Sequence, residues 1–178
     1  MPFHSINVTI EPRSFFPWQS QKIQVEGKDM FFVERSYRLL SGKTYVKEYS
    51  TVKKVISIYQ PRLQSTRFLL DISDKQYHIR RISYWQWECR CGNEYIMLNR
   101  LGGLKCILTH NGRQLAIMSL GSQLPFVADP NTYLRVNGED KLHLAIATAL
   151  IVKSISIHFN PMLLDNSQLR PIQSVELA

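Results

Sequence analysis

The three cysteines are the residues whose side chains could support the most specific chemistry. Cys89 and Cys91 are separated by one residue, and Cys106 and His110 follow later in the chain. Paired zinc ligands usually have two to four residues between them and need a fourth ligand, and a redox motif has two residues between its cysteines. We therefore expect small strand residues here, with no metal site, no cofactor and no redox role.

A second motif, Ser41-Gly42-Lys43-Thr44, resembles the end of a phosphate-binding loop. The first glycine of such a loop would fall at position 37, which is Tyr37, and no helix is predicted to follow. The five histidines are dispersed and the carboxylates are few. Nothing indicates a Ser-His-Asp or Cys-His catalytic group, although such groups converge in space and not in sequence. His143 is expected to be a hydrogen-bonded core residue. We expect a protein that is not an enzyme.

The net charge of +8 is concentrated in about a quarter of the chain. Between Arg35 and Arg81 lie eleven basic and three acidic residues, and the remainder of the chain is balanced. Such a segment is either a solvated basic face that aids solubility or a surface that attracts a polyanion, namely nucleic acid or an anionic membrane leaflet. Our candidate lipid-binding residues are Lys53, Lys54, Arg80 and Arg81. Arg80 and Arg81 are neighbours in a predicted strand, so they point to opposite sides and at most one faces a dry interior.

The stretch from Asp140 to Ile157 must be surrounded by other groups if it is a helix. Its apolar run, from Leu144 to Val152, is interrupted only by Thr148. At helical spacing these side chains point in every direction, so the helix has no polar face. Spanning a bilayer takes roughly 20 apolar residues, about twice this run. The pattern therefore predicts a helix over about 140–157 that is enclosed by protein.

The rest of the chain reads as short strands. Apolar residues alternate with polar ones, and turn signals recur, of which Asn111-Gly112 between CILTH and RQLAIMSL is the strongest. All-β chains avoid exposed edges by closing, and a closed sheet could hold the apolar helix. We predict a mainly β fold, a closed or nearly closed antiparallel β-barrel of about 10–12 strands around a buried C-terminal hydrophobic α-helix. A single domain over residues 1–165 and a tail over 166–178 are expected.

Three segments carry a resemblance to a known family. The segments FLLDISDKQYHIRRI and CILTHNGRQLAIM resemble its recurring hairpins, and LHLAIATALIVKSI resembles its central helix. Over roughly residues 20–158 the chain resembles the tubby C-terminal domain superfamily, which includes tubby proteins, phospholipid scramblases and LURP-one-related proteins. The resemblance implies a cytosolic barrel of roughly twelve strands, often bound to membranes or phosphoinositides, and not an enzyme. It does not extend to the cysteine-rich segment of scramblases or to their acidic calcium-binding segment, so it implies no scramblase activity.

The function that we expect is a non-enzymatic cytoplasmic barrel. The start of the chain shows no secretory signal, and three cysteines fit reduced cytosolic thiols. The basic face would recruit the protein peripherally to anionic membrane lipid such as a phosphoinositide. Two alternatives stay open: a nucleic-acid binder and a protein-interaction scaffold with incidental charge. The tyrosines that could stack bases are Tyr37, Tyr45, Tyr49, Tyr59 and Tyr77.

Overall fold

A computed structural model describes residues 5–12, 20–38, 41–62, 66–83, 86–102, 105–121 and 130–156. The predicted tail and the domain limit at residue 165 lie outside these ranges. The described strands are β1 (Ser5–Ile10), β2 (Gln21–Val25), β3 (Lys28–Arg38), β4 (Ser41–Glu48), β5 (Lys54–Gln60), β6 (Arg67–Ile72), β7 (Lys75–Ser83), β8 (Gln86–Cys91), β9 (Glu94–Gly102), β10 (Lys105–His110), β11 (Arg113–Ser119) and β12 (Thr132–Asn137). They are followed by a short 3₁₀ turn, η1 (Glu139–Lys141), and one helix, α1 (Leu142–Ser156).

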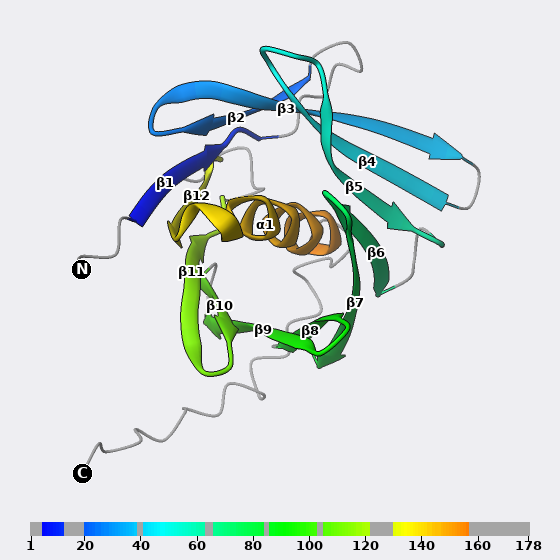
Figure 1. Cartoon of the computed structure of the whole chain (residues 1–178), viewed down its shortest axis with the longest axis vertical. Helices are drawn as coiled ribbons and strands as arrows, with labels where there is room; N and C mark the ends of the chain where they lie inside the picture. Colours follow the sequence, from blue (N-terminus) through cyan, green and yellow to red (C-terminus); the bar gives the residue numbers. More distant parts are fainter. Residues whose placement is uncertain are drawn as a thin grey trace.

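The twelve described strands form a closed antiparallel barrel (Figure 1). Each strand pairs with the strand before it, and β1 closes the ring by pairing with β12, with Val8 opposite Leu134. Closure leaves no unpaired edge, which is how an all-β protein avoids edge-to-edge association. The predicted fold class is confirmed.

The helix α1 lies inside the ring of strands (Figure 1). Every side chain from Leu144 to Val152 is buried, and α1 contacts β5, β6, β11 and β12. The polar exception, Thr148, satisfies its hydroxyl within the helix by donating to the Leu144 and Ala145 carbonyl oxygens, each at 2.9 Å. A helix that is apolar on all sides is therefore compatible with its surroundings, because those surroundings are the inward-facing side chains of the barrel.

Two local predictions can be compared with the backbone at the turns. Asn111 and Gly112 both have positive φ values, 49° and 75°, as a tight hairpin turn between β10 and β11 requires. The helix begins slightly later than the predicted residue 140, because Glu139–Lys141 form the 3₁₀ turn η1 and α1 begins at Leu142.

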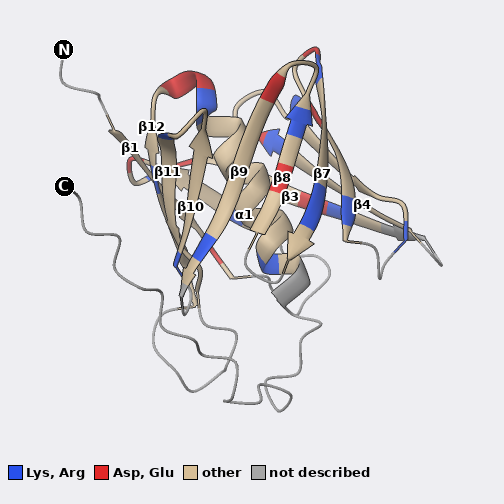
Figure 2. Cartoon of the chain, turned by 90° about the horizontal axis from the view of Figure 1, so that it is seen from below, with Lys and Arg blue, Asp and Glu red and all other residues tan. Residues whose placement is uncertain are grey.

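The strands follow one another around the barrel in chain order, as a meander, and the barrel has two openings that adjoin different ends of α1. The upper opening in Figure 2 adjoins the start of α1, and the lower opening adjoins its end. Even-numbered strands run toward the upper opening and odd-numbered strands run away from it, because every neighbouring pair is antiparallel. The position of a residue in its strand therefore fixes the opening to which it belongs.

The burial of α1 predicts the effect of a charge placed in it. Ala149 is fully buried, so Ala149→Asp leaves an unpaired carboxylate in an apolar interior and costs about 3–5 kcal/mol of unfolding free energy. Urea denaturation followed by circular dichroism measures this cost. The exposed outer position Ile117 provides the control, since Ile117→Asp should cost much less. A stable Ala149→Asp variant would mean that water reaches the helix.

Candidate anion-binding surface

The interior of the barrel has little space for a ligand. A narrow cavity of about 10 Å³ lies between α1 and strands β7–β10. Its apolar lining consists of Ile79, Trp87, Cys89, Leu98, Leu108, Ile151 and Val152. Such a volume holds at most one water molecule. Because α1 fills the barrel, binding surfaces in the described part of the chain belong to the outer wall or to the openings.

The basic segment of the sequence forms one side of the barrel. It spans the consecutive strands β3–β7, which are neighbours because the sheet is a meander. Outward-facing cations of this side alternate with buried residues, as Arg67 does with Phe68 on β6. We define the basic wall as the exposed cations of β4–β7 and their connections, apart from Lys75, which pairs with Glu94: Lys43, Lys53, Lys54, Arg62, Arg67 and Arg80.

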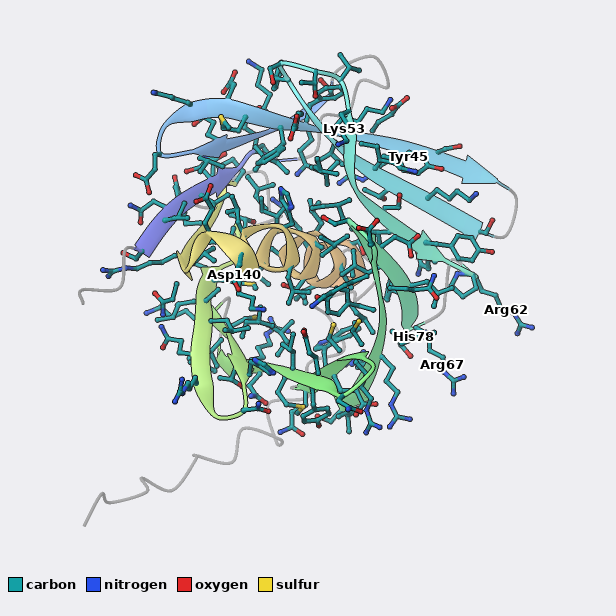
Figure 3. All side chains as sticks on the ribbon, viewed as in Figure 1. Tyr45, Lys53, Arg62, Arg67, His78 and Asp140 are labelled. Atoms are coloured by element: carbon teal, nitrogen blue, oxygen red, sulfur yellow. The ribbon has the colours of Figure 1, made fainter. Side chains whose placement is uncertain are left out.

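Strand register gathers four of these cations toward the lower opening. Arg67 is the direct cross-strand partner of Arg80, Arg62 follows the end of β5, and Lys43 lies at the start of β4. Figure 3 shows the side chains of Arg62 and Arg67 extending away from the barrel. Like charges directly opposite one another on a sheet repel. Positive charge is therefore concentrated at this level of the sheet, and we refer to Lys43, Arg62, Arg67 and Arg80 as the lower cation cluster.

One carboxylate compensates part of this cluster. The side chain of Glu88 on β8 is only 5% exposed and pairs with Arg80 Nε and, at 3.2 Å, with Arg90 Nη2. Burial by itself would raise the pKa of Glu88. The hydrogen bonds and charges of the two arginines outweigh burial and hold this pKa below its ordinary value. Arg80 is thereby committed to Glu88 and attracts an external anion less strongly than its exposure suggests.

The four candidate residues from the sequence do not form one cluster. Lys53 and Lys54 lie near the upper opening, whereas Arg80 lies near the lower one. By register, Lys54 is about seven residues from the level of Arg80 along the strands, on the order of 20 Å. Figure 3 shows Lys53 well apart from Arg62 and Arg67.

Arg80 and Arg81 point to opposite sides of β7, as the strand period predicts. Arg81 is half-buried on the inner side near the lower opening. Its Nε donates to the Ser83 carbonyl oxygen at 2.9 Å, and its guanidinium lies 5.7 Å from the centre of the Trp87 ring. It is therefore a packed residue of the opening and does not belong to the outer wall.

Two of the carboxylates at the upper opening are paired with lysines. Asp29 accepts from Lys22 at 2.9 Å, and Glu94 accepts from Lys75 at 2.8 Å. Figure 2 shows both acidic and basic residues near the top of the barrel and further basic residues lower on its walls. The cations of the basic wall thus lie near the upper opening, at Lys53 and Lys54, as well as near the lower one.

The other motifs occupy ordinary structural positions. Gly42 and Lys43 lie within strand β4, so the phosphate-loop resemblance has no matching backbone. Cys89 and Cys106 are buried free thiols, and burial raises the pKa of Cys89 to about 12. His143 is half-buried and packs edge-on against Phe31 at 5.6 Å, and burial lowers its pKa. Within the described ranges, no three His, Cys, Asp or Glu side chains gather as metal ligands.

No described helix is both long enough and apolar enough to cross a membrane. Neither a protein-family model, nor a curated protein, nor a solved structure matches this chain. The likeness to the tubby-like superfamily therefore stays a prediction from the sequence.

A buried lysine marks the lower end of the barrel interior. Lys153 of α1 donates to the Pro130 carbonyl oxygen at 3.3 Å and to the Thr132 hydroxyl at 3.2 Å. Burial, reinforced by the charge of Arg35 on β3, lowers its pKa from 10.5 to about 8. Between these two pH values the unfolded chain binds the proton and the folded chain does not.

The stability of the barrel should consequently rise with pH over the range from about 8 to 10.5. Lys153→Met removes this contribution, so the unfolding free energy of the wild type should increase relative to the variant by a few kcal/mol across that range. Denaturation at several pH values tests this, and the difference between the two proteins cancels the titration of other groups. Parallel curves for the two proteins would show that Lys153 keeps an ordinary pKa.

Proposed function

We propose that this chain is a non-enzymatic cytoplasmic binding barrel that attaches reversibly to anionic membrane surfaces through its basic wall. The observation that carries the proposal is the presence of outward cations on the consecutive strands β4, β5 and β6 of one side, namely Lys43, Lys54 and Arg67. A membrane is an extended anionic plane, and such a plane can meet cations that are spread along one side of a barrel. The resemblance to tubby-like domains supports the same proposal.

The expected affinity is moderate. Each Lys or Arg near an anionic leaflet contributes about 1 kcal/mol. Three or four such contacts give about 3–4 kcal/mol, which suits a reversible peripheral protein. Arginine guanidinium groups bind phosphate through paired hydrogen bonds. Arg62 and Arg67 therefore favour phosphate-bearing headgroups, such as phosphoinositides, as the lipid chemistry recognised.

A specific observation keeps single-stranded nucleic acid as the second candidate. Tyr45 and Tyr59 lie on the outer side of the basic wall, where bases could stack on them. A lysine already lies over each ring, however. Lys54 Nζ is 5.4 Å from the centre of the Tyr45 ring, and Lys43 Nζ is 5.8 Å from the centre of the Tyr59 ring. Stacking of a base on those ring faces would have to displace these lysines, so the membrane proposal is the stronger one. A scaffold for another protein is the third candidate.

Vesicle sedimentation tests the proposal directly. Wild-type protein should bind vesicles that contain phosphatidylserine or phosphatidylinositol phosphate and should bind pure phosphatidylcholine vesicles weakly. Arg62→Gln with Arg67→Gln removes two wall charges and should weaken binding to anionic vesicles about 30-fold. Arg113→Gln with Arg135→Gln removes the same charge from exposed positions on β11 and β12, on the other side of the barrel. This control pair should leave most of the affinity intact.

Three results would contradict the proposal. Equal binding to neutral and anionic vesicles would show that electrostatic attraction, which salt must screen, does not hold the protein on the membrane. Equal losses from the wall pair and the control pair would show that net charge acts without a specific surface. Displacement from vesicles by single-stranded RNA, with tighter binding to the RNA, would favour the nucleic-acid candidate.

A further inference from the structure

Three exposed apolar side chains lie near the upper end of the basic wall. Among the large apolar side chains of the described residues, Val52 is the most exposed at 59%, and Met30 and Tyr49 are 45% and 40% exposed. The Tyr49 amide donates to the Met30 carbonyl oxygen at 2.9 Å, which holds β3 beside the β4–β5 turn. The Tyr49 ring also packs edge-on against Phe32 at 5.4 Å. We refer to Met30, Tyr49 and Val52 as the apolar tip.

The backbone at this turn does not favour the residue found there. Val52 has a φ of 58°, in the left-handed region. A β-branched side chain is poorly tolerated in that region, whereas Gly or Asn adopts it readily. Folding alone would favour one of those residues at an exposed turn. The valine gains little burial in the folded chain to offset its strain, so we look for its role in a contact outside the chain.

The turn that presents Val52 is well ordered by hydrogen bonds. The Val52 amide donates to the Glu48 carbonyl oxygen at 2.9 Å, and the Glu48 amide donates to the Lys53 carbonyl oxygen at 2.9 Å. The Thr51 hydroxyl donates to the Glu48 carboxylate at 2.7 Å and accepts from the Lys53 amide at 3.1 Å. The apolar side chain is thus held outward on a fixed support, and little ordering entropy would oppose its burial against a partner.

Charge around the tip indicates what kind of partner it meets. Lys53 and Lys54 follow Val52 directly and are exposed. Of the neighbouring carboxylates, Asp29 pairs with Lys22, whereas Glu48 accepts a hydrogen bond from the uncharged Thr51 hydroxyl and keeps its negative charge. The two lysines outweigh that single charge. Apolar groups flanked by lysines match the boundary of an anionic bilayer, where headgroup phosphates lie just above acyl chains.

We propose that the apolar tip inserts into the interfacial layer of anionic membranes while Lys53 and Lys54 contact the headgroups. The inference rests on the proposed membrane function and adds a defined insertion element to it. The basic wall supplies long-range attraction, which salt screens, and the tip supplies an apolar contribution that salt leaves unchanged. The tip also sets the orientation of the barrel, because it continues the wall beyond the upper ends of β4 and β5.

The variant Val52→Asn separates the tip from the fold. Asparagine suits the left-handed backbone, so the variant should unfold at the same temperature as the wild type or higher. Its partition onto vesicles of phosphatidylcholine with phosphatidylserine should nevertheless fall about fivefold. Met30→Gln on β3 provides an independent second variant with a loss in the same direction. Ile117→Thr removes an exposed apolar residue from the other side of the barrel and should leave partition unchanged.

The dependence of partition on salt identifies the origin of each loss. Plots of log affinity against log salt for Val52→Asn and the wild type should be parallel, whereas Arg62→Gln with Arg67→Gln should reduce the slope. Wild-type affinity in both Val52→Asn and Met30→Gln, with a loss in the arginine pair, would overturn the insertion element and leave the membrane function standing. Wild-type protein that binds no anionic vesicle would overturn both proposals.

Discussion

The enclosure of α1 by a closed sheet is the constraint on which the rest of the structure depends. A helix that is apolar on every side cannot meet water, and a sheet of twelve strands cannot close around an empty centre without losing its packing. The two elements depend on each other, because the side chains of the helix fill the barrel interior and the strands keep water away from the helix. Burial of Leu144, Ile146, Leu150 and Ile151 at about 1.5–3 kcal/mol each makes this the largest local contribution to stability, before conformational entropy is counted.

The same constraint decides where function can reside. Because α1 occupies the interior, the described residues leave little space there for a ligand, and the outer wall and the openings are the surfaces that can interact. Because consecutive strands are neighbours in a meander, residues that are close in the sequence also lie close together on the barrel wall. Cations that cluster in the segment from Arg35 to Arg81 end up on adjacent strands, whereas a Greek-key connection would have scattered them over two sides.

The fold could be predicted from local features of the sequence. The apolar run from Leu144 to Val152 has no polar face, which indicates that it is buried. Asn111-Gly112 favours one particular hairpin turn. Both features can be interpreted from neighbouring residues alone. The pairing of β1 with β12 joins parts of the chain more than one hundred residues apart, such as Val8 and Leu134. The sequence implied closure only through the general need to protect edges.

The site was less predictable because it depends on register and strand direction. Alternation correctly predicted that Arg80 and Arg81 point to opposite sides of their strand, but it did not say which of the two faces the interior. It could not show that Lys54 begins one strand while Arg80 lies toward the end of another, which puts them near different openings. Arg67 was missed, although its position before the buried Phe68 marks it as outward. The pairing of Arg80 with Glu88 needed the cross-strand register that no local pattern contains.

The orientation of the barrel on a lipid surface tests the central claim most directly. Backbone amide signals can be recorded with anionic lipid nanodiscs that carry a spin-labelled lipid, which broadens signals from nearby residues. The account predicts the strongest broadening over residues 43–62 of β4 and β5, weak broadening over β10–β12, and little at α1. Uniform broadening around the barrel, or a maximum on β10–β12, would contradict it.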